Sequence, residues 1–210
     1  LNIQNSDSGP GWQRVKSKLF LARLGYIYRR LDGGDTAPAD SAFEALMATY
    51  PGYEAFIRAE WGRAQFKTGA LNEAAGNLAE AYKQVETIAS RDCKMAILLC
   101  YTHALSLIRK DSRRNFDEAL GIADRGRSMA SRKPLVHEGM MTRAKIYAWN
   151  YRNQYRDEIV NDNFKPLLQE GYDLEPHLKE EPFASLLKDR RKFRKAYEEM
   201  KSGLEQQNKR

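Results

Sequence analysis

Apolar residues recur every three or four positions along most of the chain, and the alternation typical of strands is almost absent. That spacing predicts amphipathic helices. The 7 prolines and 14 glycines cluster between the apolar segments rather than inside them, which favours short turns. The pattern therefore predicts an all-α fold made of short antiparallel helix pairs.

The first half of the chain is predicted to hold four helices, and the turns between them contain glycine or proline. Their expected ranges are 12–31, 39–50, 53–67 and 71–89. Gly69 lies two residues after the third range and is expected to end that helix, because a C-terminal glycine readily adopts the left-handed conformation.

The second half begins with Asp92, which we expect to cap a fifth helix that includes 95–108. This helix is apolar almost all round and is therefore expected to be central. A loop over 109–115 should follow, and Asp189 is expected to cap the last helix. The remaining ranges are predicted helices at 116–128, 135–149, 164–172 and 190–206, an ambiguous segment at 151–162, and a connector bracketed by Pro176 and Pro182.

Two tandem segments carry a repeat of small and large residues. The first contains Leu21-x2-Leu24-Gly25-x2-Tyr28, Ala39-x3-Phe43 and then Pro51. The second contains Trp61-Gly62, Gly69, Glu73-Ala74 and Ala81. The chain thus resembles the tetratricopeptide repeat (TPR) family, whose unit of about 34 residues reads W-x2-L-G-x2-Y, A-x3-F, P. The resemblance covers 18–149 and is clearer in its first half.

The resemblance implies an α-α superhelix, a TPR-like solenoid with a C-terminal capping helix. Small residues such as Gly25 and Gly62 should let paired helices approach, so that Gly25→Leu would disrupt packing. Large residues such as Tyr28, Phe43 and Trp61 should fill the gaps between pairs. The expected organisation is a polar lead-in at 1–11, the repeat domain at 12–177, and a capping helix with a basic tail at 178–210.

In the TPR family the first helix of each pair lines a concave groove that binds an extended peptide or a partner helix. The resemblance therefore implies a non-enzymatic scaffold or docking module. The groove positions mix cations with aromatics, which suits an acidic partner segment. The expected partner-binding residues are Arg23, Tyr26, Arg30, Arg63, Phe66, Lys67 and Lys145. The clamp of chaperone-binding members is absent, because Ala22 and Ala59 occupy positions that would have to be polar.

The formal net charge of +7 is unevenly distributed and leaves two alternatives open. Basic clusters at 109–133 and 188–195 would suit a nucleic-acid backbone. The chain begins with Leu1 rather than methionine, so it is expected to be a piece of a longer polypeptide. It would then fit the regulatory domain of a larger enzyme.

No pattern of catalytic, metal-binding or cofactor-binding residues is predicted. Cys93 and Cys100 are seven residues apart on one expected helix, too distant for a disulfide, which suits the cytoplasm. His103, His137 and His177 are scattered, and a Cys100–His103 pair on an apolar helix is a poor nucleophile and base. No segment approaches the ~18 uninterrupted apolar residues of a membrane span.

Overall fold

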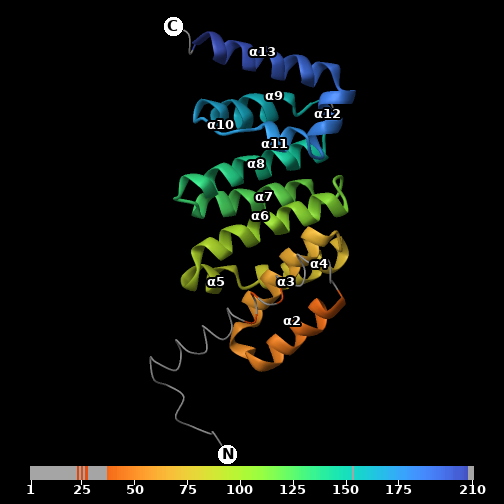
Figure 1. The fold of residues 1–210 in the computed structure, drawn as a ribbon, viewed down its shortest axis with the longest axis vertical. Helices are drawn as coiled ribbons and strands as arrows, with labels where there is room; N and C mark the ends of the chain where they lie inside the picture. The colour runs from red at the N-terminus through yellow and green to blue at the C-terminus, as the bar shows by residue number, and fades with distance from the viewer. Residues whose placement is uncertain (1–22, 24, 26, 28–36, 153, 208–210) are drawn as a thin grey trace, which may run out of the picture.

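The computed structural model describes residues 23, 25, 27, 37–152 and 154–207. Within these residues, helices are the only regular secondary structure, which confirms the all-α prediction. The helices lie one above another in a single stack, with α2 towards one end and α13 at the other (Figure 1). Of the expected first helix, Arg23, Gly25 and Ile27 are described and are helical, whereas Tyr26, Tyr28 and Arg30 lie outside the described residues.

The first part of the stack follows the predicted ranges closely, with one exception. Its elements are α2 (Ala37–Thr49), a 3-10 turn η1 (Pro51–Tyr53), α3 (Glu54–Thr68), α4 (Leu71–Tyr82) and α5 (Val85–Arg91). Gly69 ends α3 with φ of 89°, as predicted. The single helix expected over 71–89 is wrong, because the chain bends at Lys83 and Gln84. The bend turns Val85 and Ile88 into the core beside α6.

The central part consists of three long helices. They are α6 (Cys93–Lys110), α7 (Phe116–Met129) and α8 (Lys133–Trp149). Asp92 caps α6 as predicted, since its carboxylate accepts a hydrogen bond from the Met95 amide at 3.0 Å. α6 is also central, because it packs against α3, α4 and α5 on one side and α7 and α8 on the other.

The last part is built from shorter elements. They are α9 (Arg156–Ile159), a π-helical turn η2 (Val160–Phe164), α10 (Lys165–Gln169), α11 (Glu175–Leu178), α12 (Phe183–Asp189) and α13 (Arg191–Gln207). The ambiguous segment therefore becomes helical from Arg156 onward. Asp189 is the last residue of α12 and not the cap of α13, so that detail of the prediction is wrong.

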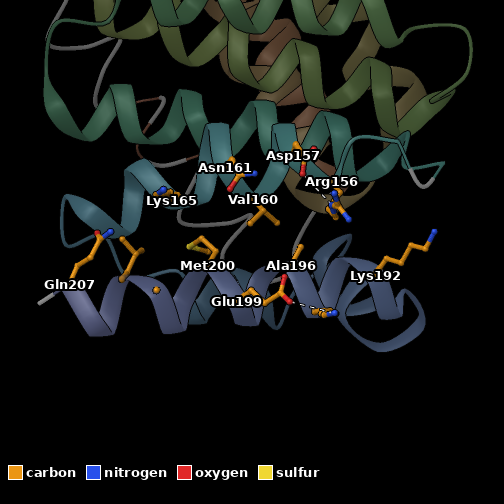
Figure 2. A pocket seen from close by; sticks show the side chains of 13 residues that line it. Arg156, Asp157, Val160, Asn161, Lys165, Lys192, Ala196, Glu199, Met200 and Gln207 are labelled. Carbon is orange, nitrogen blue, oxygen red and sulfur yellow. Dashed lines mark hydrogen bonds and ion pairs between the residues drawn. The ribbon is translucent and has the colours of Figure 1, made fainter. Parts of the chain in front are cut away.

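The side chains of Phe164, Phe183 and Phe193 join the last elements in one core, and all three are fully buried. Phe164 meets Phe183 edge-on with ring centroids 5.1 Å apart. Figure 2 shows α13 running alongside the segment from Arg156 to Lys165, with a cavity between them. The core thus holds only part of α13 against its neighbours.

Close approach of α3 and α4 depends on Gly62, as the repeat pattern predicts. A Cβ at Gly62 would lie 2.6 Å from the Leu78 Cγ. The Trp61 ring stacks on Phe43 at a centroid distance of 5.7 Å and so joins α3 to α2, also as predicted. The expectation for Gly25 is wrong: this residue is exposed, and a Cβ there would meet nothing within 4 Å.

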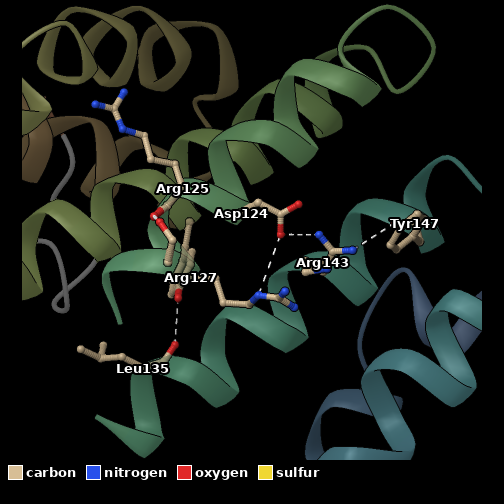
Figure 3. Close-up of polar contacts among 8 residues, drawn as sticks. Asp124, Arg125, Arg127, Leu135, Arg143 and Tyr147 are labelled. Carbon is tan, nitrogen blue, oxygen red and sulfur yellow. Dashed lines mark hydrogen bonds and ion pairs between the residues drawn. The ribbon is translucent and has the colours of Figure 1, made fainter. Parts of the chain in front are cut away.

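Tyr101 of α6 fills the junction with α7 and α8. Its ring is 2% exposed, and its hydroxyl donates a hydrogen bond to the Leu135 carbonyl at 3.0 Å. The ring fits because the facing backbone positions are Gly126 and Gly139, where a Cβ would overlap the ring or its hydroxyl. Beside this junction, Arg143 of α8 binds Asp124 of α7 and also donates to the Tyr147 hydroxyl (Figure 3).

We expect Gly126→Ala to destabilise the protein by about 1–3 kcal/mol through overpacking. The new Cβ would lie 2.8 Å from both the Cys100 Cβ and the Tyr101 Cε1. Gly121→Ala is the matched control, because Gly121 lies on the same helix, is exposed and has nothing within 4 Å. That change should stabilise α7 by about 0.5–1 kcal/mol. Urea unfolding measures the free energy of unfolding of both variants. An equal change in the two would contradict the packing described for Tyr101.

Candidate functional site

Three helices that are distant in sequence present side chains to one common surface, which we call the α3–α6–α8 face. The guanidinium of Arg109, at the end of α6, lies 5.4 Å from the ring centroid of Phe66 and 5.9 Å from that of Trp149. Phe66 belongs to α3 and Trp149 to α8. Both distances are within the range of cation–π attraction. Arg109 therefore links the C-terminal ends of the three helices.

The predicted partner-binding residues are only partly brought together. Phe66 and Lys145 lie on the α3–α6–α8 face, and Lys67 is exposed in the last turn of α3. Arg23 lies apart from them, with its guanidinium 5.8 Å from the Tyr50 ring. Tyr26 and Arg30 lie outside the described residues.

Arg63 also lies on the α3–α6–α8 face, but its charge is already compensated. Its guanidinium is 3.1 Å from the carboxylate of Glu60, one turn earlier on α3, and Glu60 is 6% exposed. A buried carboxylate needs such a partner, because an unpaired buried charge is costly. Arg63 thus stabilises α3 in addition to any role it has in binding.

Glu138 of α8 adds a negative charge among these cations. Desolvation raises the pKa of its carboxyl, while the nearby charges of Arg63, Lys145 and Lys94 act in the opposite direction. These three cations come from α3, α8 and α6 respectively. The face is therefore of mixed charge rather than uniformly basic.

A cavity of about 590 Å³ opens beside Lys145 and Glu138 and continues the α3–α6–α8 face towards α11. The surface of its walls is mostly apolar, although most of the lining side chains also carry a polar group. The lining residues are Leu105, Lys133, Pro134, His137, Glu138, Met141, Thr142, Lys145, Tyr172 and His177. A mostly apolar hollow with convergent polar groups is the usual form of a ligand-binding pocket.

Two of the three histidines, His137 and His177, line this cavity, although they are 40 residues apart in the sequence. Tyr172 lies between them: its ring meets His137 edge-on at 5.2 Å, and its hydroxyl is 2.9 Å from the His177 Nε2. Burial and the charge of Lys145 lower the pKa of His177, and burial raises that of Tyr172. Both groups are therefore neutral at neutral pH, and the direction of the hydrogen bond between them depends on which imidazole nitrogen of His177 carries the proton.

His137 has an acidic partner at the same cavity. Its Nε2 is 2.9 Å from the Glu170 carboxylate, which also accepts a hydrogen bond from the Lys133 ammonium at 3.0 Å. Hydrogen bonds from His137 and Lys133 lower the pKa of Glu170. The side chains around the cavity are thus held in place by one another, which favours a preformed pocket.

Cys100 and His103 lack the properties of a nucleophile and its base. Burial raises the pKa of the Cys100 thiol to about 12 and lowers that of His103 to about 4. His103 packs on the Tyr82 ring at 5.3 Å, and within the described part of the chain its Nδ1 has no hydrogen-bond partner. Both cysteines are free, as predicted, with Cys93 exposed and Cys100 buried.

Several cations of the two predicted nucleic-acid clusters are engaged within the protein. Arg125 donates to the Tyr82 hydroxyl at 3.1 Å and to the Glu86 carboxylate. Arg194 donates to the carbonyls of Leu187 and Lys188. These contacts leave fewer arginines available to a phosphate backbone than the sequence suggests.

Comparisons of the chain with protein-family models, with curated proteins and with solved structures found no significant match. In the part of the chain that the structure describes, no group of three or more His, Cys, Asp or Glu side chains is arranged to hold a metal ion. No helix among the same residues is long and apolar enough to cross a bilayer. The functional argument therefore depends on the geometry of the surface.

His103 should make the stability of the protein depend on pH. Its pKa falls from the usual 6.5 to about 4 in the folded state, so the unfolded chain binds its proton more readily. Stability is then unaffected above pH 6.5, decreases as the pH falls towards 4, and changes little below it. The loss amounts to about 3 kcal/mol at most.

Urea unfolding of the wild type and of His103→Phe at pH 7.5 and pH 4.5 measures this effect. The wild type should lose more stability between the two pH values than the variant, because only the wild type has this buried imidazole. Equal losses would show that His103 titrates normally in the folded protein.

Proposed function

We propose that this protein is a TPR-like helical-repeat module that binds an extended, acidic segment of a partner protein along the α3–α6–α8 face. The observation that carries the proposal is the convergence of Phe66, Arg109 and Trp149, from the helices α3, α6 and α8, on one surface. Cations next to aromatic rings on a continuous face suit a ligand with both carboxylates and apolar side chains.

The packing order of the helices supports the repeat interpretation. α6 contacts both members of the preceding α3–α4 pair, and α8 contacts both members of the α6–α7 pair. Stacking of each pair on the previous one is the arrangement of helical repeats. Gly62 and Gly126 provide the close helix approaches within the two pairs. The first helices of successive pairs are then α3, α6 and α8, which form the face.

The charges on the face indicate how a partner would be oriented. Lys145 is partly buried and lines the cavity, whereas Lys67 is exposed at the end of α3. Glu138 is close enough to Arg63 and Lys145 for their charges to oppose the rise that desolvation causes in the pKa of its carboxyl, and its own charge disfavours an uninterrupted run of acidic residues in the ligand. We therefore propose a segment in which acidic residues are separated by apolar or aromatic ones, with one side chain entering the cavity.

Selection of peptides from a random phage-displayed library on the immobilised protein tests this function. The enriched peptides should contain more Asp and Glu than the starting library, together with apolar residues. Lys145→Glu should weaken their binding about tenfold, because it reverses a charge at the cavity without removing a buried ion pair. Arg63→Glu is a poorer choice, since it would remove an arginine that pairs with the buried Glu60 and put a second carboxylate beside it.

Arg91→Glu is the matched control for Lys145→Glu, because Arg91 is exposed on α5 and the change of net charge is the same. Its affinity for the selected peptides should stay within about twofold of the wild type. An equal loss in both variants would mean that net charge, and not the α3–α6–α8 face, attracts the peptides. The proposal would be wrong if the selected peptides contained no more Asp and Glu than the starting library.

A further inference from the structure

A second cavity, of about 610 Å³, lies at the C-terminal end of the stack and is separate from the α3–α6–α8 face. One wall is the segment from Arg156 to Lys165, and the other is α13 (Figure 2). Its lining comprises Arg156, Asp157, Val160, Asn161, Lys165, Lys192, Lys195, Ala196, Glu199, Met200, Gly203, Leu204 and Gln207.

The floor of this cavity continues the apolar stripe of α13 past the point where that stripe is covered. Phe193 and Tyr197 are buried, but Met200 and Leu204, on the next turns, are only partly buried and line the cavity. A half-covered apolar stripe at helical spacing is a surface on which a further helix can pack.

Small residues on the same side of α13 leave room for a helix to approach. Ala196 and Gly203 both line the cavity, and a Cβ at Gly203 would meet nothing within 4 Å. The stretch from Ala196 to Gln207 spans about 17 Å of helix. This length matches roughly three turns of a second helix lying along α13, which is a common mode of peptide recognition.

The rim of the cavity is basic. It holds four cations but only two carboxylates, and the two carboxylates are taken up locally. Asp157 pairs with Arg156 at 3.2 Å, and Glu199 with Lys195 at 3.6 Å. Among the described residues, no ion pair is formed by Lys165 or Lys192. Figure 2 places Lys165 towards the Gln207 end of the opening, and Arg156 and Lys192 towards the other.

We propose that this cavity is the docking site for an amphipathic helix of a partner protein, with an apolar stripe that fills the floor and carboxylates that meet the cations at both ends. A nucleic-acid backbone would use the same cations but would leave Met200 and Leu204 uncovered. The apolar floor thus selects a helix over a polyphosphate, and the basic rim selects an acidic helix.

The probe is a fluorescein-labelled peptide of about three helical turns, with leucines at positions i, i+3, i+4 and i+7 and glutamates elsewhere. A second peptide has lysines in place of the glutamates, and a third has the first composition in scrambled order. Fluorescence anisotropy with the full chain should show binding of the acidic amphipathic peptide. The lysine and scrambled peptides should bind at least about tenfold more weakly.

Variants of the cavity locate the binding. Leu204→Gln removes part of the apolar floor, and Lys192→Glu reverses a charge on the rim. Each change should lower the affinity for the acidic amphipathic peptide about tenfold. Lys188→Glu is the matched control, because Lys188 is exposed on α12 outside the cavity, and it should change affinity by less than about twofold. Thermal unfolding, followed by circular dichroism, verifies that each variant is folded.

Three results would overturn the proposal. Equal weakening by Lys188→Glu and Lys192→Glu would indicate attraction by net charge alone. Equal binding of the scrambled peptide would show that no helical stripe is recognised. Tighter binding of a single-stranded oligonucleotide, lost in Lys192→Glu and retained in Leu204→Gln, would assign the surface to nucleic acid instead.

Discussion

The burial of one tyrosine between two helix backbones determines how the centre of this protein is arranged. The ring of Tyr101 needs space that a Cβ would occupy, and its hydroxyl needs an acceptor because it is shielded from water. Gly126 and Gly139 provide the space, and the Leu135 carbonyl is the acceptor. Since α6 also contacts α3 and α4, this contact fixes α8 relative to the first part of the stack. The α3–α6–α8 face depends on that position.

The distribution of charge on the α3–α6–α8 face depends on its carboxylates as much as on its excess of basic residues. Arg63 neutralises the buried carboxylate of Glu60, and Glu138 introduces an acid between cations of three helices. Arg109 lies against the rings of Phe66 and Trp149, and it forms no ion pair with a carboxylate of the described residues. Net charge alone is therefore a poor description of the surface, because the positions of a few carboxylates decide where a ligand's acids can bind.

Features set by adjacent residues or by the repeated small and large residues were predictable from the sequence, whereas other features that depend on the path of the chain were not. The end of α3 at Gly69 and the cap at Asp92 are local effects. The bend after Tyr82 cannot be recognised in the sequence, because apolar residues keep their helical spacing on both sides of it. Arg109 was assigned to a loop and a basic cluster, yet it is helical and packs on aromatic rings. The approach of His137 and His177 to one cavity requires the turn after α10 at Gly171, where φ is 78°, whereas the predicted helix ran through this glycine to residue 172.

The π-helical turn at Val160–Phe164 changes the direction in which the side chains of α10 point. In such a turn the amide of residue i+5 bonds to the carbonyl of residue i, as Lys165 does to Val160. One extra residue is thereby accommodated, and α10 is rotated by about 100° relative to an uninterrupted helix. Val160 and Lys165 can then both face α13 although they are five residues apart. Loss of a single residue here would restore regular winding and turn Lys165 away, so the spacing of this segment matters as much as its composition.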